Sequence, residues 1–199
     1  DELLTADLEE WALALECMGR PAEAIPLLAR AVTEYGVAGE RLRASSPAIT
    51  LAMIHLERGE LAAANGWHKR AAQLIDGATE SREHGLWCWM GARIKGAEAE
   101  PEHALALAEQ AFEVGKQLED PVVESLGLIS CRLHRAEVLG VHGTLKEAET
   151  LVRAALDQLA LDAPWATGDA LRVLGDIHLA AGDFAEAETA YRASHAAGW

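Results

Sequence analysis

The chain has 199 residues, of which 50% are hydrophobic and 25% are charged, a composition typical of a globular protein. The formal net charge of −15 disfavours binding to phosphate backbones and to anionic membrane surfaces, so direct nucleic-acid binding by this segment is not expected. No apolar run reaches the roughly 18 residues of a membrane span, and no N-terminal targeting segment stands out, so we expect a cytoplasmic protein.

Alanine and leucine supply most of the apolar residues and aromatic residues only 5%, which favours helices over strands. Three helix starts are expected where a capping residue precedes a proline: Ser46-Pro47, Asp120-Pro121 and Asp162-Ala163-Pro164. No stretch is predicted to form a strand. The predicted helices, with limits good to about 2–4 residues, span 3–15, 21–35, 46–58, 60–75, 81–95, 101–117, 121–141, 144–160, 164–181 and 183–197.

Small residues recur along the chain at a fixed spacing. An alanine follows a turn glycine by five positions in four copies, and the third copy has Ala104 after a looser turn near Gly96. These alanines are Ala24, Ala64, Ala104, Ala148 and Ala187, at intervals of 40, 40, 44 and 39 residues. A second small residue lies seven or eight positions before each turn, where paired helices would cross: Ala12, Ala52, Gly91, Ala136 and Gly175.

A repeat of this length predicts a solenoid, in which each helical hairpin packs only on its neighbours. We therefore expect an all-α fold, a right-handed α-solenoid of about five hairpins in a single domain. The repeats are expected at 3–36, 46–76, 81–118, 121–160 and 164–199.

The fifth copy resembles the tetratricopeptide repeat (TPR). Leu174-Gly175, Gly182-Asp183-Phe184 with Ala187, and Tyr191 match that motif, and the third copy matches its first helix at Trp87, Met90, Gly91 and Ile94. The chain departs from the family in its period, which is nearer 40 than 34 residues, and in lacking the proline that closes each repeat.

A narrower resemblance runs from Cys131 to Trp199, which is similar to the helical-repeat region of bacterial LuxR-type transcriptional regulators. That resemblance implies signal sensing or partner docking, with a helix-turn-helix DNA-binding domain elsewhere in the polypeptide. The missing initiator Met and the last helix without a polar cap fit a piece of a longer protein. An open C-terminal end near Tyr191 and Trp199 should meet more chain, a partner or a second copy.

The sequence contains no recognisable catalytic or metal-binding motif. Cys17, Cys88 and Cys131 are far apart and are expected to be buried, reduced thiols. His134 and His142 lie eight positions apart without a metal-ligand spacing, so neither a metal nor a cofactor is expected.

His55 and His178 occupy equivalent repeat positions and are interpreted as core or half-buried imidazoles. Among the tryptophans, Trp11 and Trp87 are interpreted as core. Three others could line a surface or pocket or could fill space between longer helices: Trp67, Trp89 and Trp165.

A concave groove is predicted from the first helix of each pair, at the residue after the crossing position and three before it. Its central residues are Ile49, Met53, Cys88, Ala92, Leu133, Glu137, Arg172 and Asp176, with Glu9 and Leu13 at the N-terminal end. Such a groove would suit an amphipathic helix, an extended peptide or an elongated small molecule. Tight superhelical winding, which would pack these residues across the coil, is the alternative.

Three functions remain open at this point. The first is a non-enzymatic sensor of a LuxR-type regulator that recognises a protein, peptide or small effector. The second is a stand-alone TPR peptide receptor or scaffold without a DNA-binding domain. The third is an enzyme with its site in the groove, which the lack of paired titratable groups disfavours.

Overall fold

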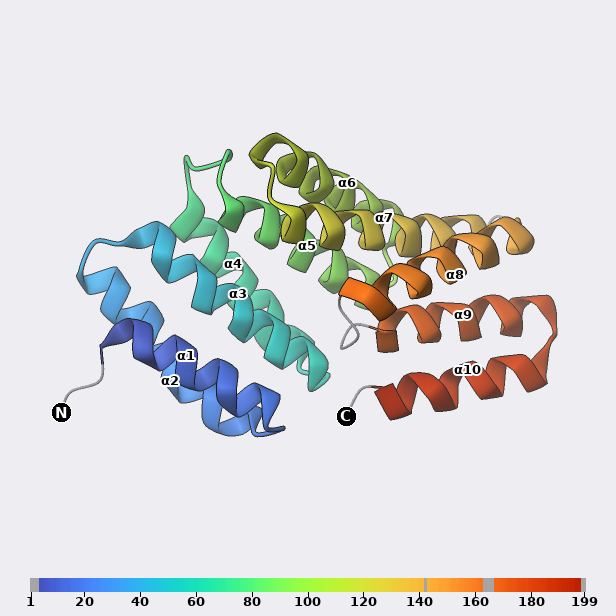
Figure 1. Cartoon of the computed structure of the whole chain (residues 1–199), viewed down its shortest axis with the longest axis horizontal. Coiled ribbons are helices and arrows are strands. Elements are labelled where there is room, and N and C mark those ends of the chain that lie inside the picture. The colour runs from blue at the N-terminus through green and yellow to red at the C-terminus, as the bar shows by residue number, and fades with distance from the viewer. Residues whose placement is uncertain (1–3, 142, 163–166, 198–199) are drawn as a thin grey trace.

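The computed structural model describes residues 4–141, 143–162 and 167–197, and throughout these ranges the regular structure is helical. The helices are α1 (Thr5–Cys17), α2 (Pro21–Val37), α3 (Arg41–Glu57), α4 (Leu61–Ile75), α5 (Arg82–Ala97), α6 (Pro101–Leu118), α7 (Pro121–Val141), α8 (Leu145–Asp162), α9 (Thr167–Ala181) and α10 (Phe184–Ala197). Consecutive helices form antiparallel hairpins that stand side by side in a row (Figure 1). The predicted all-α solenoid is confirmed.

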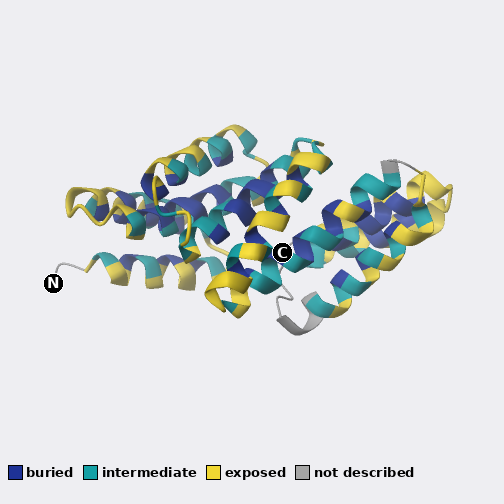
Figure 2. Cartoon of the chain, turned by 90° about the horizontal axis from the view of Figure 1, so that it is seen from above, coloured by how far each residue is buried: buried dark blue, intermediate teal, exposed yellow. Residues whose placement is uncertain are grey.

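The core is the seam between neighbouring helices. Buried residues follow this seam through both halves of the row, while the outer turns are exposed (Figure 2). The buried side chains form two clusters, one drawn from α1 to α6 and the other from α7 to α10. The first helices of successive hairpins also contact one another, α3 with α5, α5 with α7 and α7 with α9, so the row curves.

Each hairpin turns on a residue with positive φ. Gly19, Gly59, Gly143 and Gly182 have φ between 68° and 84°, a conformation that costs glycine little. The third turn uses Ala99, at φ 59°, so the turn is as tight as the others although it lacks glycine. The prediction of a looser turn near Gly96 is therefore wrong.

This turn moves the register of the third hairpin by one residue. The residue seven positions before Ala99 is Ala92, which is fully buried like Ala12, Ala52 and Ala136 at the same place. Ala92 is therefore the residue at which the helices cross, rather than Gly91.

Prolines mark helix starts less reliably than expected. Asp120 caps α7 as predicted, since its Oδ1 accepts hydrogen bonds from the backbone of Val122 and Val123, at 3.0 Å each. The start predicted at Ser46-Pro47 is wrong, because α3 begins at Arg41 and buries Pro47 inside the helix. Packing of the surrounding apolar face outweighs the lost backbone donor. The start predicted at 162–164 lies largely outside the described residues.

The two core clusters meet where α6 crosses α7 at backbone distance. A Cβ on Gly115 would lie 2.3 Å from the Glu124 nitrogen, and one on Gly127 would lie 2.4 Å from the Phe112 nitrogen. Reciprocal glycines thus allow the backbones of α6 and α7 to approach closely. This junction sets how the last two hairpins follow the first three.

Candidate functional site

The inner face of the row is formed by the first helix of each hairpin. In the corrected register, each first helix contributes two residues to this face, one three positions before the crossing position and one directly after it. These pairs are Glu9 and Leu13, Ile49 and Met53, Trp89 and Arg93, Leu133 and Glu137, and Arg172 and Asp176. Trp89 and Arg93 replace the predicted Cys88 and Ala92, which are fully buried in the core.

Exposure along this face is greatest at its ends. Leu13 is 61% exposed, Met53 is half-buried, and Arg172 and Asp176 are exposed at the far end. The middle is closed, because the side chains of Ile49, Trp89 and Leu133 are buried. The predicted groove residues therefore do not line one continuous apolar channel.

Arg93 closes the middle of the inner face. Its Nη2 lies 3.0 Å from Asp169 Oδ2 of α9, and its Nη1 lies 3.6 Å from Glu57 Oε1 of α3. The guanidinium also lies over the Trp89 ring, 5.4 Å from the ring centre. Arg93 Nη1 is buried and has no hydrogen-bond partner among the described residues. One side chain thus joins helices from the second, third and fifth hairpins.

Paired charges occupy the C-terminal end of the inner face. Arg172 Nη2 lies 2.9 Å from Glu137 Oε1, and Arg172 Nη1 lies 2.8 Å from Asp176 Oδ2. Tyr191 donates to Asp176 Oδ1 at 2.6 Å, and His134 Nδ1 lies 2.7 Å from Glu137 Oε2. Burial acts to raise the pKa of Glu137, but the His134 hydrogen bond and the Arg172 charge outweigh it and lower the pKa. The charges here already satisfy one another.

The N-terminal end of the inner face is electrostatically unbalanced. Burial, and then the negative charge of Glu57, raise the pKa of Glu16 to about 7. Burial also raises the pKa of Glu57 despite the attraction of Arg93. Both carboxylates lie in the last turn of their helices, α1 and α3, where the helix dipole disfavours negative charge. This end therefore favours an added positive charge.

Comparison with known proteins agrees with the hairpin geometry. Residues 168–193, which include the α9–α10 turn, match the family described as "Tetratricopeptide repeat". The chain is an α-solenoid of TPR-like hairpins. Repeats of this family are generally non-catalytic protein-interaction modules. No curated protein matches the chain.

Two solved structures are similar to this solenoid over most of its length. The TPR-like repeats of a putative kinesin light chain of Podosopora anserina match with a TM-score of 0.58 at 18% identity, covering 96% of this chain and 93% of that one. BtubC (BKLC) from P. vanneervenii matches with a TM-score of 0.60 at 19% identity, covering 98% of this chain and 79% of that one. At these identities the likeness shows the fold.

The tryptophans divide differently from the sequence-based interpretation. Trp11 is 52% exposed, so its assignment to the core is wrong. Trp87 is half-buried against the core and Trp89 is buried, so both fill space between helices of the solenoid. Trp67 packs against the core with part of its ring exposed on the outer surface. Trp165 lies outside the described residues.

A stack of aromatic rings lies beside the buried thiol of Cys88, whose Sγ is 3.7 Å from His84 Nε2. The imidazole of His68 lies parallel to the Trp87 ring, with ring centres 4.8 Å apart. The imidazole of His84 also stacks on Trp87, with ring centres 5.7 Å apart. Burial raises the pKa of Cys88 to about 11 and lowers the pKa of both histidines. A neutral thiol beside neutral imidazoles has no nucleophilic thiolate, so this cluster is part of the packing.

The other cysteines and histidines considered in the sequence differ in their burial. Cys17 is exposed, so the expected burial is wrong for this residue, while Cys131 is half-buried. His178 is buried and His55 is half-buried beside Glu60, as interpreted from the repeat. His142 lies outside the described residues.

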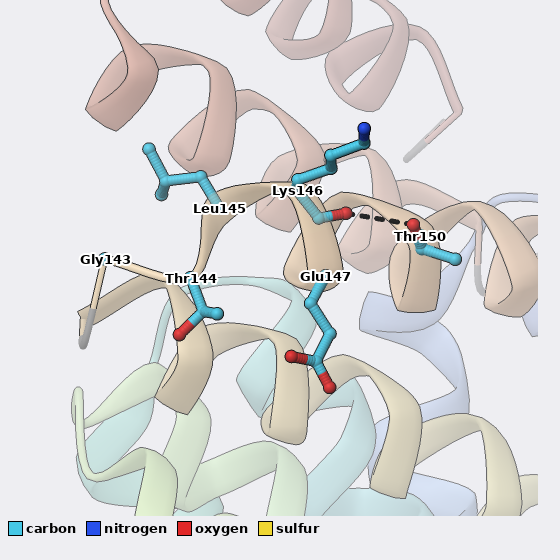
Figure 3. A pocket seen from close by; sticks show the side chains of 6 residues that line it. All are labelled: Gly143, Thr144, Leu145, Lys146, Glu147 and Thr150. Carbon is cyan, nitrogen blue, oxygen red and sulfur yellow. Dashed lines mark hydrogen bonds between the residues drawn. The ribbon is translucent and has the colours of Figure 1, made fainter.

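Two surface hollows lie away from the inner face. One, of about 460 Å³, is formed by Gly143, Thr144, Leu145, Lys146, Glu147 and Thr150 at the start of α8. Its side chains diverge, with Leu145 and Lys146 on the opposite side of the helix from Glu147 (Figure 3). The other, of about 380 Å³, lies on the outer side between α2 and α4 beside Trp67 and Arg70. Neither gathers a set of convergent polar groups.

The structure offers no coordination site in the part of the chain that it describes, because no three His, Cys, Asp or Glu side chains come together there as a metal ion requires. None of the described helices has the length and apolarity to cross a membrane.

Proposed function

We propose that this chain is a non-catalytic binding module that holds a polypeptide segment carrying basic and apolar side chains. The segment would bind at the N-terminal inner face, which we define as Glu9, Leu13, Glu16, Met53 and Glu57. The observation that carries this proposal is that two neighbouring carboxylates, Glu16 and Glu57, lie on the same end of the solenoid as the side chain of Leu13, which is 61% exposed.

A basic side chain from a partner would remove an unfavourable interaction as well as form a new one. Glu16 has a pKa near 7 because its carboxylate is partly buried near a second negative charge. A lysine or arginine placed between Glu16 and Glu57 would favour the ionised form of both. The apolar side chains of Leu13 and Met53 would contact the apolar residues of the same segment.

The overall charge supports the same kind of partner. With a net charge of −15, the chain attracts cationic segments and accelerates their association at low salt. The C-terminal inner face, Glu137, Arg172 and Asp176, has its charges paired within the chain and would form the far edge of the binding surface.

The proposal is tested with a labelled amphipathic helical peptide whose polar face carries lysines, and with the same peptide carrying glutamates instead. Fluorescence anisotropy should show binding of the lysine peptide only. Leu13→Asp should weaken this binding at least about tenfold, which corresponds to about 1.4 kcal/mol.

Val37→Asp is the control, because Val37 is an exposed apolar residue on α2, the second helix of its hairpin, outside the inner face. It should leave the affinity unchanged. Equal loss in both variants, or equal binding of both peptides, would refute the proposed surface.

The regulator context is carried by the resemblance of residues 131–199 to the repeat region of LuxR-type regulators. In that context the bound segment, or a small effector in its place, would be the signal, and DNA would be bound elsewhere in the polypeptide. The alternative is a stand-alone TPR peptide receptor or scaffold, which the TPR-like fold also supports. The full coding sequence separates them: a basic helix-turn-helix segment supports the regulator, and a chain without one supports the scaffold.

A further inference from the structure

The outer side of the solenoid has an apolar hollow between the second helices of the first two hairpins. Helices α2 and α4 both pack against α3, and between them lies a hollow of about 380 Å³. Ligand pockets in proteins measure about 300–1,000 Å³, so a partner side chain can enter a hollow of this size. We call it the outer hollow, and its lining includes Ala29, Val32, Thr33, Val37, Trp67 and Arg70.

The wall that α2 contributes is uncharged at positions where later second helices carry charged or amide side chains. Ala29, Thr33 and Val37 are spaced by four residues, so they lie on one side of α2. Counted from the anchor alanine of each repeat, the residues equivalent to the first two are exposed and polar in α4 and in α6: Lys69 and Gln73, and Glu109 and Glu113. The repeat accepts polar side chains at these positions, so packing within the chain does not require the uncharged wall of α2.

The outer hollow combines a buried base with apolar side chains that remain in contact with water. Val32 is buried, and Trp67 is half-buried against the core. Val37 is 87% exposed, although its side chain is apolar and branched. A partner that covers Val37 and Trp67 would remove apolar surface from water, and tryptophan is among the residue types that contribute most to binding.

The rim of the outer hollow is positively charged. Arg70 donates a hydrogen bond to Gln73 Oε1 at 3.4 Å, and Arg41 Nη2 of α3 donates to the backbone oxygen of Gln73 at 2.6 Å. Both arginines are exposed, and neither is paired with a carboxylate in the part of the chain that the structure describes. Glu34 of α2 is already paired with Arg30 at 2.6 Å. This end of α4 is therefore locally basic in a chain whose net charge is −15.

We propose that the outer hollow binds an acidic amphipathic helix of a partner protein. An apolar side chain of that helix would enter the hollow between Val37 and Trp67, and a carboxylate one helical turn away would pair with Arg70. Arginine and carboxylate groups can form two parallel hydrogen bonds, which would fix the orientation of the bound helix. The site lies away from the N-terminal inner face and takes a partner of the opposite charge, so it goes beyond the proposed function.

The preference for an acidic partner is a specific signature, because the rest of the chain opposes it. A net charge of −15 repels an acidic peptide at long range and attracts a basic one. An acidic peptide that binds in spite of this repulsion must therefore use a locally basic surface.

Two amphipathic helical peptides test the proposal, with the same apolar face and with either glutamates or lysines on the polar face. Fluorescence anisotropy measures the affinity of each peptide, and NMR follows the indole N–H signal of Trp67, assigned from its absence in Trp67→Phe. The glutamate peptide should bind and shift the Trp67 signal. The lysine peptide should leave that signal unchanged.

Two substitutions in the outer hollow should each weaken binding of the glutamate peptide at least about tenfold. Thr33→Glu gives α2 the acidic residue that α6 has at the equivalent position, Glu113, and Arg70→Glu reverses the charge that pairs with the peptide. Both positions are exposed, so helicity by circular dichroism should be unchanged. Lys146→Glu makes the same change in charge at an exposed lysine of α8 and should leave the affinity unchanged.

The two peptides also separate this site from the N-terminal inner face. Val37→Asp should weaken binding of the glutamate peptide and not of the lysine peptide, whereas Leu13→Asp should do the reverse. A glutamate peptide that does not bind at millimolar concentration would overturn the proposal, as would binding that leaves the Trp67 signal unchanged. Equal losses in Arg70→Glu and Lys146→Glu would show a general effect of charge and would overturn it as well.

Discussion

At the scale of single residues, the most unusual group is the carboxyl of Glu16. Its pKa of about 7 lies well above the ordinary value of 4.5, because burial and the charge of Glu57 disfavour the ionised form. The folded state therefore binds the proton more tightly than the unfolded chain. The stabilisation that this group contributes is fully present below pH 4.5 and is lost as the pH rises through 7.

Glu16→Gln should remove this dependence. At pH 8 the variant should be more stable than the parent chain by about 1 kcal/mol, less than the full shift implies, because the side chain is partly solvated. Near pH 4.5 the two proteins should be equally stable. Urea unfolding at both pH values measures the difference, and a variant that is less stable at pH 8 would contradict the assigned pKa.

The burial of a residue is predictable from the sequence where the repeat determines its surroundings. It is not predictable where its surroundings depend on a neighbouring part of the chain. The buried alanines and the placement of His55 and His178 follow from periodicity alone. Trp11 occupies a position that is buried in later hairpins, so its exposure depends on what precedes α1. A local pattern does not contain that information.

At the scale of helices, small residues determine how closely neighbours approach. The sequence predicted ten helices because alanines and glycines recur at one spacing, and the structure has them in the same order. The repeat predicts the wrong register for the third hairpin, because Ala99 adopts a positive φ that is far more common at glycine. The start of α3 was misplaced because packing retained Pro47 inside the helix.

The α6–α7 crossing provides a test at this scale. Gly127→Ala places a methyl group 2.4 Å from the Phe112 nitrogen, so the helices must separate, and we expect a loss of about 1–3 kcal/mol. Gly140→Ala is the control in the same helix, since its methyl would meet only Ile177 at 4.0 Å. The control should be neutral or should gain up to about 1 kcal/mol from helix propensity. Thermal unfolding that ranks the variants in the opposite order would refute the close crossing.

At the scale of the whole molecule, curvature decides which part of the inner face is available. The row bends until Arg93 of α5 reaches Asp169 of α9, 76 residues away in sequence. This contact closes the middle of the face and leaves an unbalanced acidic end and a paired, salt-bridged end. The repeat predicts that the first helices form this face, but curvature depends on how four junctions between hairpins add together, which periodicity does not specify.

The location of the bound segment tests the account most directly. A lysine-rich amphipathic peptide with a nitroxide label at its centre is added to the isotope-labelled chain, and backbone amide signals are followed by NMR. We predict selective broadening of the amides of Leu13, Glu16 and Met53, with those of Arg172 and Asp176 less affected. Broadening centred on Arg172 and Asp176, or on the outer hollow beside Trp67, would contradict the proposed binding surface.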